Sequence, residues 1–126
     1  MSNIFLDTIK GISCSRPPVW FMRQAGRILP SYRKLKENHH FYDMMKDPEL
    51  ASEVTLLPIN DLGVDSAILF SDILVIPDAL GLELIFTKNG PKFTNALSEG
   101  SHNQLDFVPQ KLDYIYTNIK KTVEKK

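Results

Sequence analysis

Two short hydrophobic runs stand out along the chain because no polar residues alternate within them. Residues 19–22 read VWFM and residues 67–70 read AILF. Unbroken apolar runs of this length are typical of parallel strands that are covered on both faces. Prolines and an arginine bound the first run, and Gly63 precedes the second, which suits the turns that strands need. The pattern therefore predicts two buried parallel strands.

Between these runs the apolar positions change to helical spacing. A first helix is expected to open near Ser31, which is a suitable N-cap. A second helix is better marked, because Asp47 can cap it and Pro48 suits its first turn. Pro58 is expected to kink or end this helix. Its apolar positions repeat at helical spacing at Leu50, Val54 and Leu57.

The C-terminal part of the chain predicts a hairpin and a further helix. An Asn-Gly pair at residues 89–90 lies between apolar positions and predicts a hairpin or loop excursion, although Pro91 weakens its second strand. Pro109 can open the last helix, and lysines gather at its end, where the helix dipole favours cations. The expected apolar face of this helix consists of Leu112, Ile115, Tyr116, Ile119 and Val123.

A strand, a helical connection and a second strand form a βαβ unit, so the fold class is α/β. Arg23 directly follows the first strand, and Asp72 comes two residues after the second. Because the carboxyl ends of parallel strands meet at one rim, we expect these two side chains on the same rim, where α/β sheets and barrels bind their ligands. Arg27 belongs to the same loop as Arg23. The pattern therefore predicts a ligand-binding site at this rim that contains charged side chains.

Composition narrows the function classes further. The 126 residues include 15 basic and 15 acidic side chains, so no bulk field indicates binding to nucleic acid or to an anionic membrane. No apolar run approaches the roughly 20 residues of a membrane helix. The N-terminus does not resemble a secretory signal, and the single cysteine, Cys14, cannot form an internal disulfide, which together predict a cytoplasmic protein. His39 and His40 alone are too few ligands for a metal.

Three stretches carry a resemblance to a known family. The segments "PVWFMRQAGR", "LPSYR" and "AILFSDILVIPDALG" closely resemble the N-terminal part of the uroporphyrinogen decarboxylase family. The resemblance implies a (β/α)₈ TIM barrel, of which residues 1–126 form a single incomplete domain. It also implies a cytoplasmic homodimer that uses neither a metal nor an organic cofactor.

The resemblance further implies a carboxy-lyase that removes four acetate carboxyl groups from uroporphyrinogen III to give coproporphyrinogen III in haem biosynthesis. Arg23 and Arg27 match the arginines that bind the carboxylates of this tetrapyrrole, and a guanidinium fork suits that task. Asp72 matches the aspartate that stabilises a protonated, cationic pyrrole during loss of carbon dioxide. Gln24 and Ala25 would add backbone N–H groups beside the two arginines. The apolar floor of the site would come from Phe70, Ile68 and Trp20.

Other interpretations remain beside this one. Arginines in a loop are often solvated, and Asp72 could cap the short helix that follows it. Tyr32 and Arg33 are assigned to packing, with support of the neighbouring site residues as the alternative. The chain could also be a non-catalytic remnant of the decarboxylase, or a corrinoid methyltransferase of the same superfamily.

Overall fold

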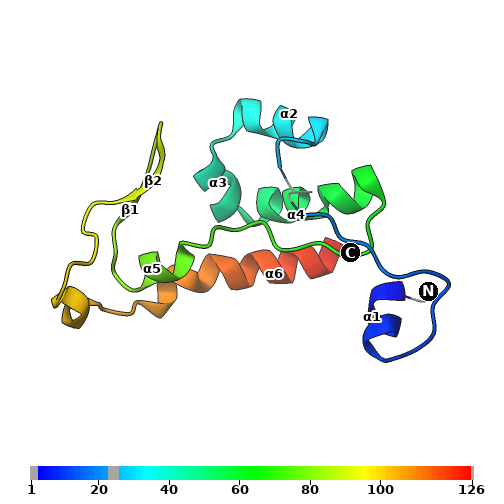
Figure 1. Ribbon diagram of the computed structural model, residues 1–126. Helices are drawn as coiled ribbons and strands as arrows, with labels where there is room; N and C mark the ends of the chain where they lie inside the picture. Colours follow the sequence, from blue (N-terminus) through cyan, green and yellow to red (C-terminus); the bar gives the residue numbers. More distant parts are fainter. Residues whose placement is uncertain (1–2, 23–25, 126) are drawn as a thin grey trace.

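The computed structural model describes residues 3–22 and 26–125. Within these residues the chain forms mainly helices together with one two-stranded sheet (Figure 1). The elements in chain order are α1 (Ile4–Ile9), α2 (Pro30–Asn38), α3 (Phe41–Lys46), α4 (Pro48–Leu62), α5 (Val75–Ala79), β1 (Leu84–Thr87), β2 (Gly90–Phe93), η1 (Ser101–Gln104), η2 (Pro109–Leu112) and α6 (Asp113–Lys125).

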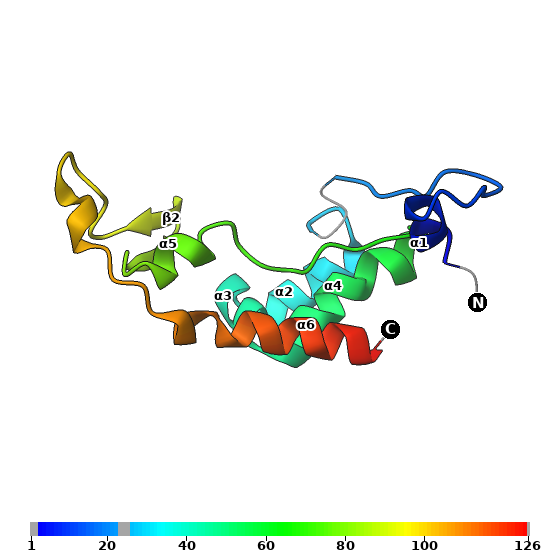
Figure 2. The same cartoon turned by 90° about the horizontal axis from the view of Figure 1, so that it is seen from below.

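The centre of the molecule is a helical unit of α3, α4 and α6. Helix α6 lies along α4 in both ribbon views, and α3 packs beside them (Figures 1 and 2). Met44 and Met45 of α3 and Val54 of α4 are fully buried there. The same core cluster also contains Leu29, Tyr32, Leu57 and Phe70.

Helix α4 begins as the sequence predicts. Asp47 Oδ1 accepts hydrogen bonds from the backbone N–H groups of Glu49 at 2.8 Å and Leu50 at 3.1 Å, and Pro48 occupies the first turn. Of the two effects expected of Pro58, a kink or the end of the helix, the second does not occur, because α4 continues to Leu62. Pro58 is fully buried, and its packing offsets the one backbone hydrogen bond that its missing N–H removes. The helix ends where Gly63 adopts a left-handed conformation with φ 66°.

Helix α2 begins slightly earlier than predicted. Pro30 is its first residue and Leu29 is the N-cap, which makes no side-chain capping bond, so the assignment of Ser31 as N-cap is wrong. Proline suits the first helical position because it has no N–H that would need a partner. The Ser31 hydroxyl instead donates a hydrogen bond to the carboxylate of Asp61 on α4.

The two predicted parallel strands are the main correction. Residues 19–22 and 67–70 form no β-strand in the described part of the chain, so the expected βαβ unit is absent. The two segments are joined at their beginnings, where the Asp65 N–H donates to the Val19 carbonyl at 2.9 Å. Asp65 Oδ2 accepts from the Val19 N–H at 2.7 Å and from Arg16 at 2.7 Å. A strand needs a ladder of hydrogen bonds to a neighbouring strand. Between these two segments the bonds that join Asp65 to Val19 form no such ladder.

The predicted hairpin is confirmed. Strands β1 and β2 pair antiparallel, from Leu84 opposite Phe93 to Thr87 opposite Gly90. Lys88 and Asn89 form the turn, and Gly90 has φ 107°, a conformation that other residues rarely adopt. Pro91 is tolerated because the hairpin has no third strand that would need its N–H.

The predicted C-terminal helix is present, but Pro109 opens the short 3-10 helix η2 and α6 itself begins at Asp113. Helix α6 also turns a different face to the core. Tyr116 is 63% exposed, Ile119 45% and Val123 69%, whereas Asn118 is fully buried. Asn118 faces α3 because its Nδ2 donates to the Met45 carbonyl at 2.8 Å. The predicted apolar face is therefore mostly exposed. No helix in residues 3–22 and 26–125 has the length and apolar character needed to span a membrane.

Candidate functional site

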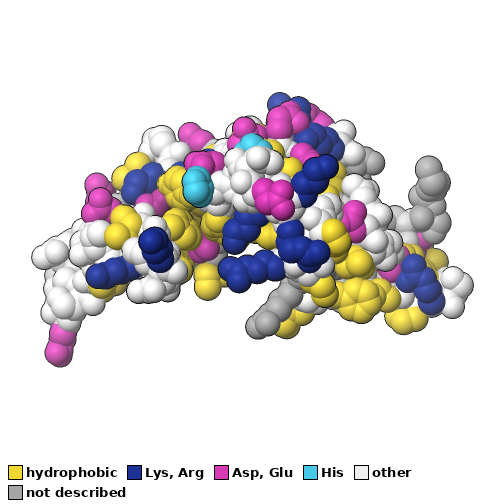
Figure 3. All heavy atoms as spheres, turned by 90° about the horizontal axis from the view of Figure 1, so that it is seen from above, with side chains coloured by type: hydrophobic (Ala, Val, Ile, Leu, Met, Phe, Trp, Pro, Cys, Tyr) yellow, Lys and Arg dark blue, Asp and Glu magenta, His cyan; other side chains and the backbone are white. Residues whose placement is uncertain are grey.

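A cleft of about 950 Å³ opens between the hairpin, helices α2 and α3, and the turn before α5. Its lining combines charged side chains with aromatic ones. On the face of the molecule that Figure 3 shows, Lys and Arg side chains gather near the middle, with hydrophobic side chains exposed beside them. The cleft is lined by Gly26, Arg27, Tyr32, Lys36, His40, Phe41, Tyr42, Asp72, Phe86, Thr87, Lys88 and Gly90.

Arg27 lies on a turn immediately before α2. The Leu29 N–H closes this turn by donating to the Gly26 carbonyl at 3.0 Å. The Arg33 guanidinium donates to the carbonyl of Arg27 at 2.9 Å and so fixes the backbone that carries the Arg27 side chain. Burial raises the pKa of the Tyr32 phenol, and the positive charge of Arg27 opposes part of this rise. The Arg27 charge therefore acts on the wall of the cleft.

Asp72 is distant from Arg27 in the sequence but lines the same cleft. Its Oδ1 accepts a hydrogen bond from the Leu74 N–H at 2.7 Å. Leu74, not Asp72, is the N-cap of α5, so Asp72 fixes the turn before the helix instead of capping it. Within the described part of the chain, no further hydrogen bond engages the other carboxylate oxygen. The carboxylate is thus held in place by the Leu74 N–H.

The negative charge of Asp72 also reaches Tyr114 on α6. Burial raises the pKa of the Tyr114 phenol to about 12, and the carboxylates of Asp78 and Asp72 add to this rise. Lys46 lies over the Tyr114 ring at 4.2 Å and over the Tyr42 ring at 5.0 Å. This cation anchors Tyr42, one wall of the cleft, to α6.

Phe70 supports the cleft from behind. It is only 7% exposed and does not line the opening. Its ring packs edge-on against Phe41 with centroids 5.3 Å apart and against Tyr32 at 6.1 Å, and both of those rings line the cleft. Ile68 is 62% exposed and Trp20 40% exposed, and both lie outside the lining of this cleft.

The remaining predicted site residues, Arg23, Gln24 and Ala25, lie outside the described residues. Their roles stay predictions.

Sequence reasoning missed two cations of the cleft, Lys36 and Lys88. Lys36 lies one helical turn after Tyr32, and the i, i+4 spacing could have placed both on one face of α2. Lys88 precedes the Asn-Gly pair that predicts the hairpin, but sequence spacing does not indicate which face of the molecule the hairpin meets. The described residues hold no group of three His, Cys, Asp or Glu side chains that could bind a metal ion.

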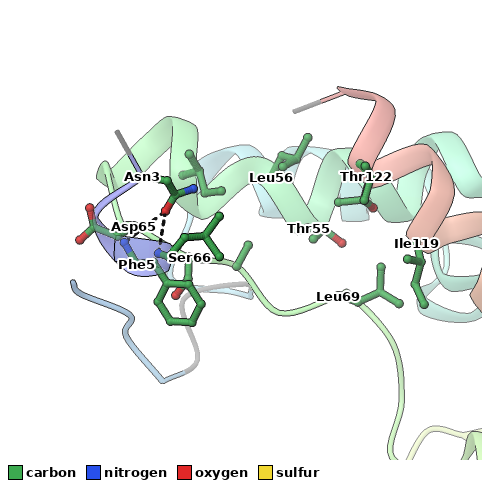
Figure 4. A pocket seen from close by; sticks show the side chains of 13 residues that line it. Asn3, Phe5, Thr55, Leu56, Asp65, Ser66, Leu69, Ile119 and Thr122 are labelled. Carbon is green, nitrogen blue, oxygen red and sulfur yellow. Dashed lines mark hydrogen bonds between the residues drawn. The ribbon is translucent and has the colours of Figure 1, made fainter. Parts of the chain in front are cut away.

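A second, smaller cavity lies away from these charges. It measures about 320 Å³ and lies between α1, α4, α6 and residues 65–69. Figure 4 shows Phe5, Leu69 and Ile119 around it, with Asn3 capping α1 through its hydrogen bond to the Phe5 N–H at 3.1 Å. Its lining is mostly apolar and includes part of the exposed face of α6.

Comparisons with known proteins agree with the three resembling stretches. The uroporphyrinogen decarboxylase (URO-D) family model matches residues 2–126. Proteins named uroporphyrinogen decarboxylase are 43% identical in Christiangramia forsetii, 48% in a Sulfurovum species and 49% in Sphingopyxis alaskensis. These alignments cover 96%, 95% and 90% of this chain but 37%, 36% and 34% of the relatives. The chain therefore spans somewhat more than a third of the length of these relatives, and it belongs to the uroporphyrinogen decarboxylase family.

Proposed function

We propose that this chain provides the substrate-binding and cation-stabilising part of a uroporphyrinogen decarboxylase. The observation that carries the proposal is the shared cleft of Arg27 and Asp72, two residues from separate parts of the sequence. Aromatic rings form the walls between them. The cleft thus combines positive charge, a fixed carboxylate and an apolar surface, which a large ring compound with acidic side chains requires.

Arg27 would bind carboxylates of the tetrapyrrole. Its guanidinium can form two parallel charge-assisted hydrogen bonds to one carboxylate, and Lys36 adds a second cation on the same wall. Arg23, with the backbone N–H groups of Gln24 and Ala25, would extend this anion site. The aromatic side chains Phe41 and Tyr42 would contact the apolar body of the substrate, and Phe70 would hold Phe41 in place.

Asp72 would stabilise the positive charge that develops during the reaction. A proton adds to a pyrrole carbon, the bond between the acetate methylene and its carboxylate breaks, and carbon dioxide leaves. The electron pair of that bond neutralises the cationic ring. Protonation of the methylene carbon then gives a methyl group, and loss of the proton that was added to the ring carbon restores the neutral pyrrole. The carboxylate of Asp72, already fixed by the Leu74 N–H, can accept hydrogen bonds from pyrrole N–H groups at the moment when the ring is cationic.

The family membership also supports three features of the complete protein. These are a (β/α)₈ barrel to which this chain contributes the N-terminal part, a homodimeric assembly and a cytoplasmic location. The contact between Val19 and Asp65 suits the barrel, because it joins the beginnings of the two segments that would become its first strands.

The test is a fused protein in which residues 1–126 replace the matching portion of the Sulfurovum relative. We expect this protein to convert uroporphyrinogen to coproporphyrinogen with release of carbon dioxide. Asp72→Asn should lower the rate by about 10² to 10³ because it removes the charge, while the amide oxygen still accepts from the Leu74 N–H.

The matched control is Asp78→Asn, which removes a carboxylate that pairs with Lys111 at 3.3 Å and does not line the cleft. It should leave the rate nearly unchanged. A folded fused protein that binds uroporphyrin but releases no carbon dioxide would support the non-catalytic remnant instead. Parental activity of Asp72→Asn would remove the proposed role of its charge.

A further inference from the structure

We propose that the hairpin β1–β2 is a substrate clamp whose tip residue, Lys88, binds a carboxylate of the ligand in the cleft. This inference rests on the proposed function and adds a binding group that neither the family resemblance nor the sequence pattern indicated. Lys88 and Phe86 of the hairpin line the same cleft as Arg27. The clamp therefore faces the anion site.

The hairpin is attached to the wall of the cleft through one aromatic side chain. The Phe86 ring centroid lies 5.6 Å from that of Phe41 and 5.7 Å from that of Tyr42, with tilted ring planes. Such pairs stabilise beyond simple burial. Phe86 is still 39% exposed, so part of its ring remains available to a ligand. Phe86 thus positions the hairpin and adds apolar surface to the cleft.

The tip that carries Lys88 is held by its own hydrogen bonds. The Thr87 hydroxyl donates to the Gly90 carbonyl at 2.9 Å and accepts from the Asn89 N–H at 3.2 Å. Gly90 permits the turn through its positive φ of 107°. At the other end of the hairpin, the Thr94 N–H donates to the Glu83 carbonyl at 3.0 Å. These bonds order the turn backbone, which limits the positions that the ammonium group of Lys88 can reach.

The charge of Lys88 has no partner among the described residues of the cleft. Within residues 3–22 and 26–125, no ion pair or hydrogen bond engages its ammonium group. Arg27 and Lys36 reach the cleft from the turn before α2 and from α2 itself, whereas Lys88 reaches it from the hairpin. A ring with carboxylates around its edge presents acidic groups in several directions. Cations on different walls can therefore bind different carboxylates of one molecule.

The experiment is a titration of the 126-residue chain with uroporphyrin, the stable oxidised form of the substrate, followed by porphyrin fluorescence at low salt. Lys88→Ala should weaken binding about threefold to fivefold, as expected for one exposed charge contact. Lys88→Arg should retain affinity within about twofold, because it keeps the charge. Arg27→Ala should weaken binding about tenfold or more, because a guanidinium fork is lost.

Lys92→Ala is the matched control. Lys92 lies on β2 of the same hairpin, opposite Ile85, and is outside the lining of the cleft. The Lys92→Ala substitution removes the same charge from outside the cleft. The variant should therefore bind uroporphyrin with an affinity close to that of the parent. The positioning role of Phe86 has its own readout. In a Phe86→Ala background, Lys88→Ala should have almost no further effect, because the tip is no longer held against the cleft.

The two proposals can fail separately. If Arg27→Ala weakens binding and Lys88→Ala does not, the clamp is wrong and the proposed function stands. Equal losses for Lys88→Ala and Lys92→Ala indicate a general charge effect and also overturn the clamp. Additive losses for Phe86→Ala and Lys88→Ala overturn the positioning role. If the parent chain binds no uroporphyrin, the clamp is contradicted, whereas carbon dioxide release by the fused protein still decides the proposed function.

Discussion

The helical unit of α3, α4 and α6 differs from the segments at residues 19–22 and 67–70, which were predicted to be buried strands. Met44 and Val54 in the helical unit are fully buried. Phe21 and Ile68 in the segments are 56% and 62% exposed, and Phe70, at the end of the second segment, packs against the helices. A helix satisfies its backbone groups within itself, whereas a strand depends on a neighbour for every hydrogen bond. Within the described residues the helices therefore form, whereas residues 19–22 and 67–70 have no neighbouring strand to pair with.

The largest expected effect separates the two regions directly. Met44→Ala should destabilise the chain by about 2–5 kcal/mol, because it removes a fully buried side chain and leaves a cavity. Ile68→Ala should change stability by less than about 0.5 kcal/mol, because the side chain is largely exposed. Urea denaturation followed by helical circular dichroism measures both. Similar losses for the two variants would show that residues 67–70 pack as a strand after all.

In the fused protein we expect the difference in stability loss between Met44→Ala and Ile68→Ala to disappear. If the remainder of the relative completes the proposed barrel, Ile68→Ala should cost as much as other core truncations, about 2–5 kcal/mol. An unchanged, small effect there would contradict the placement of this segment in a barrel strand.

An intermediate effect is expected within the helical unit. Asn118→Ala should destabilise the chain by about 1–3 kcal/mol, because the buried Met45 carbonyl loses the hydrogen bond from Asn118 Nδ2. Thr117→Ala is the control, since its exposed hydroxyl donates to the Asp113 carbonyl within α6 and does not join the two helices. The same urea titration measures both. Equal midpoints for the two variants would show that the bond between α6 and α3 contributes nothing.

The smallest effect concerns the junction of the two extended segments and appears only in acid. The hydrogen bond from Arg16, followed by that from the Val19 N–H, lowers the pKa of Asp65 below its ordinary range. A carboxyl with a lowered folded pKa stabilises the fold above the ordinary aspartate pKa, and this stabilisation disappears as the pH falls through the folded pKa. Proteolysis near residues 16–22 should therefore accelerate in acid, and Asp65→Asn should make it fast already at neutral pH.

Glu49→Gln is the control for that measurement. Hydrogen bonds from Lys121 and Lys125 lower the pKa of Glu49 as well, but Glu49 joins α4 to α6 and not the extended segments. It should leave proteolysis near residues 16–22 unchanged. Acid-insensitive cleavage in the parent chain would contradict the role of Asp65.

Local signals predicted the caps and the turn well, and the strands and long-range contacts poorly. Asp47 and Pro48 marked the start of α4, and Asn89–Gly90 marked the hairpin, because caps and turns depend on a few neighbouring residues. The strands at residues 19–22 and 67–70 were wrong because the apolar pattern indicates only that a segment is suited to burial. Asn118 was missed because its partner, Met45, lies far away in the sequence.

The candidate site also combines residues that the local sequence indicated with residues that only long-range contacts bring to the cleft. The resembling stretches indicated Arg27 and Asp72, and the structure brings both to one cleft. Lys36 and Lys88 could not be assigned to it from spacing, since the cleft forms where the hairpin meets α2 and α3. The structure also places Phe70 in the core behind the cleft, a position that its neighbours in the sequence do not reveal.

The bond from Asn118 to Met45 joins residues that are 73 positions apart, and both the hairpin and Asp72 lie within the intervening chain. Closing a longer loop costs little more than closing a shorter one, about 0.6 kcal/mol for each doubling of length. Residues 96–105, which precede the backbone bonds of Asp106 and Val108 to the end of α5, could therefore gain or lose several residues during evolution while the anchor at Asn118 stays in place. Variation in the length of this connection would then alter the surroundings of the cleft without disturbing the helices that support it.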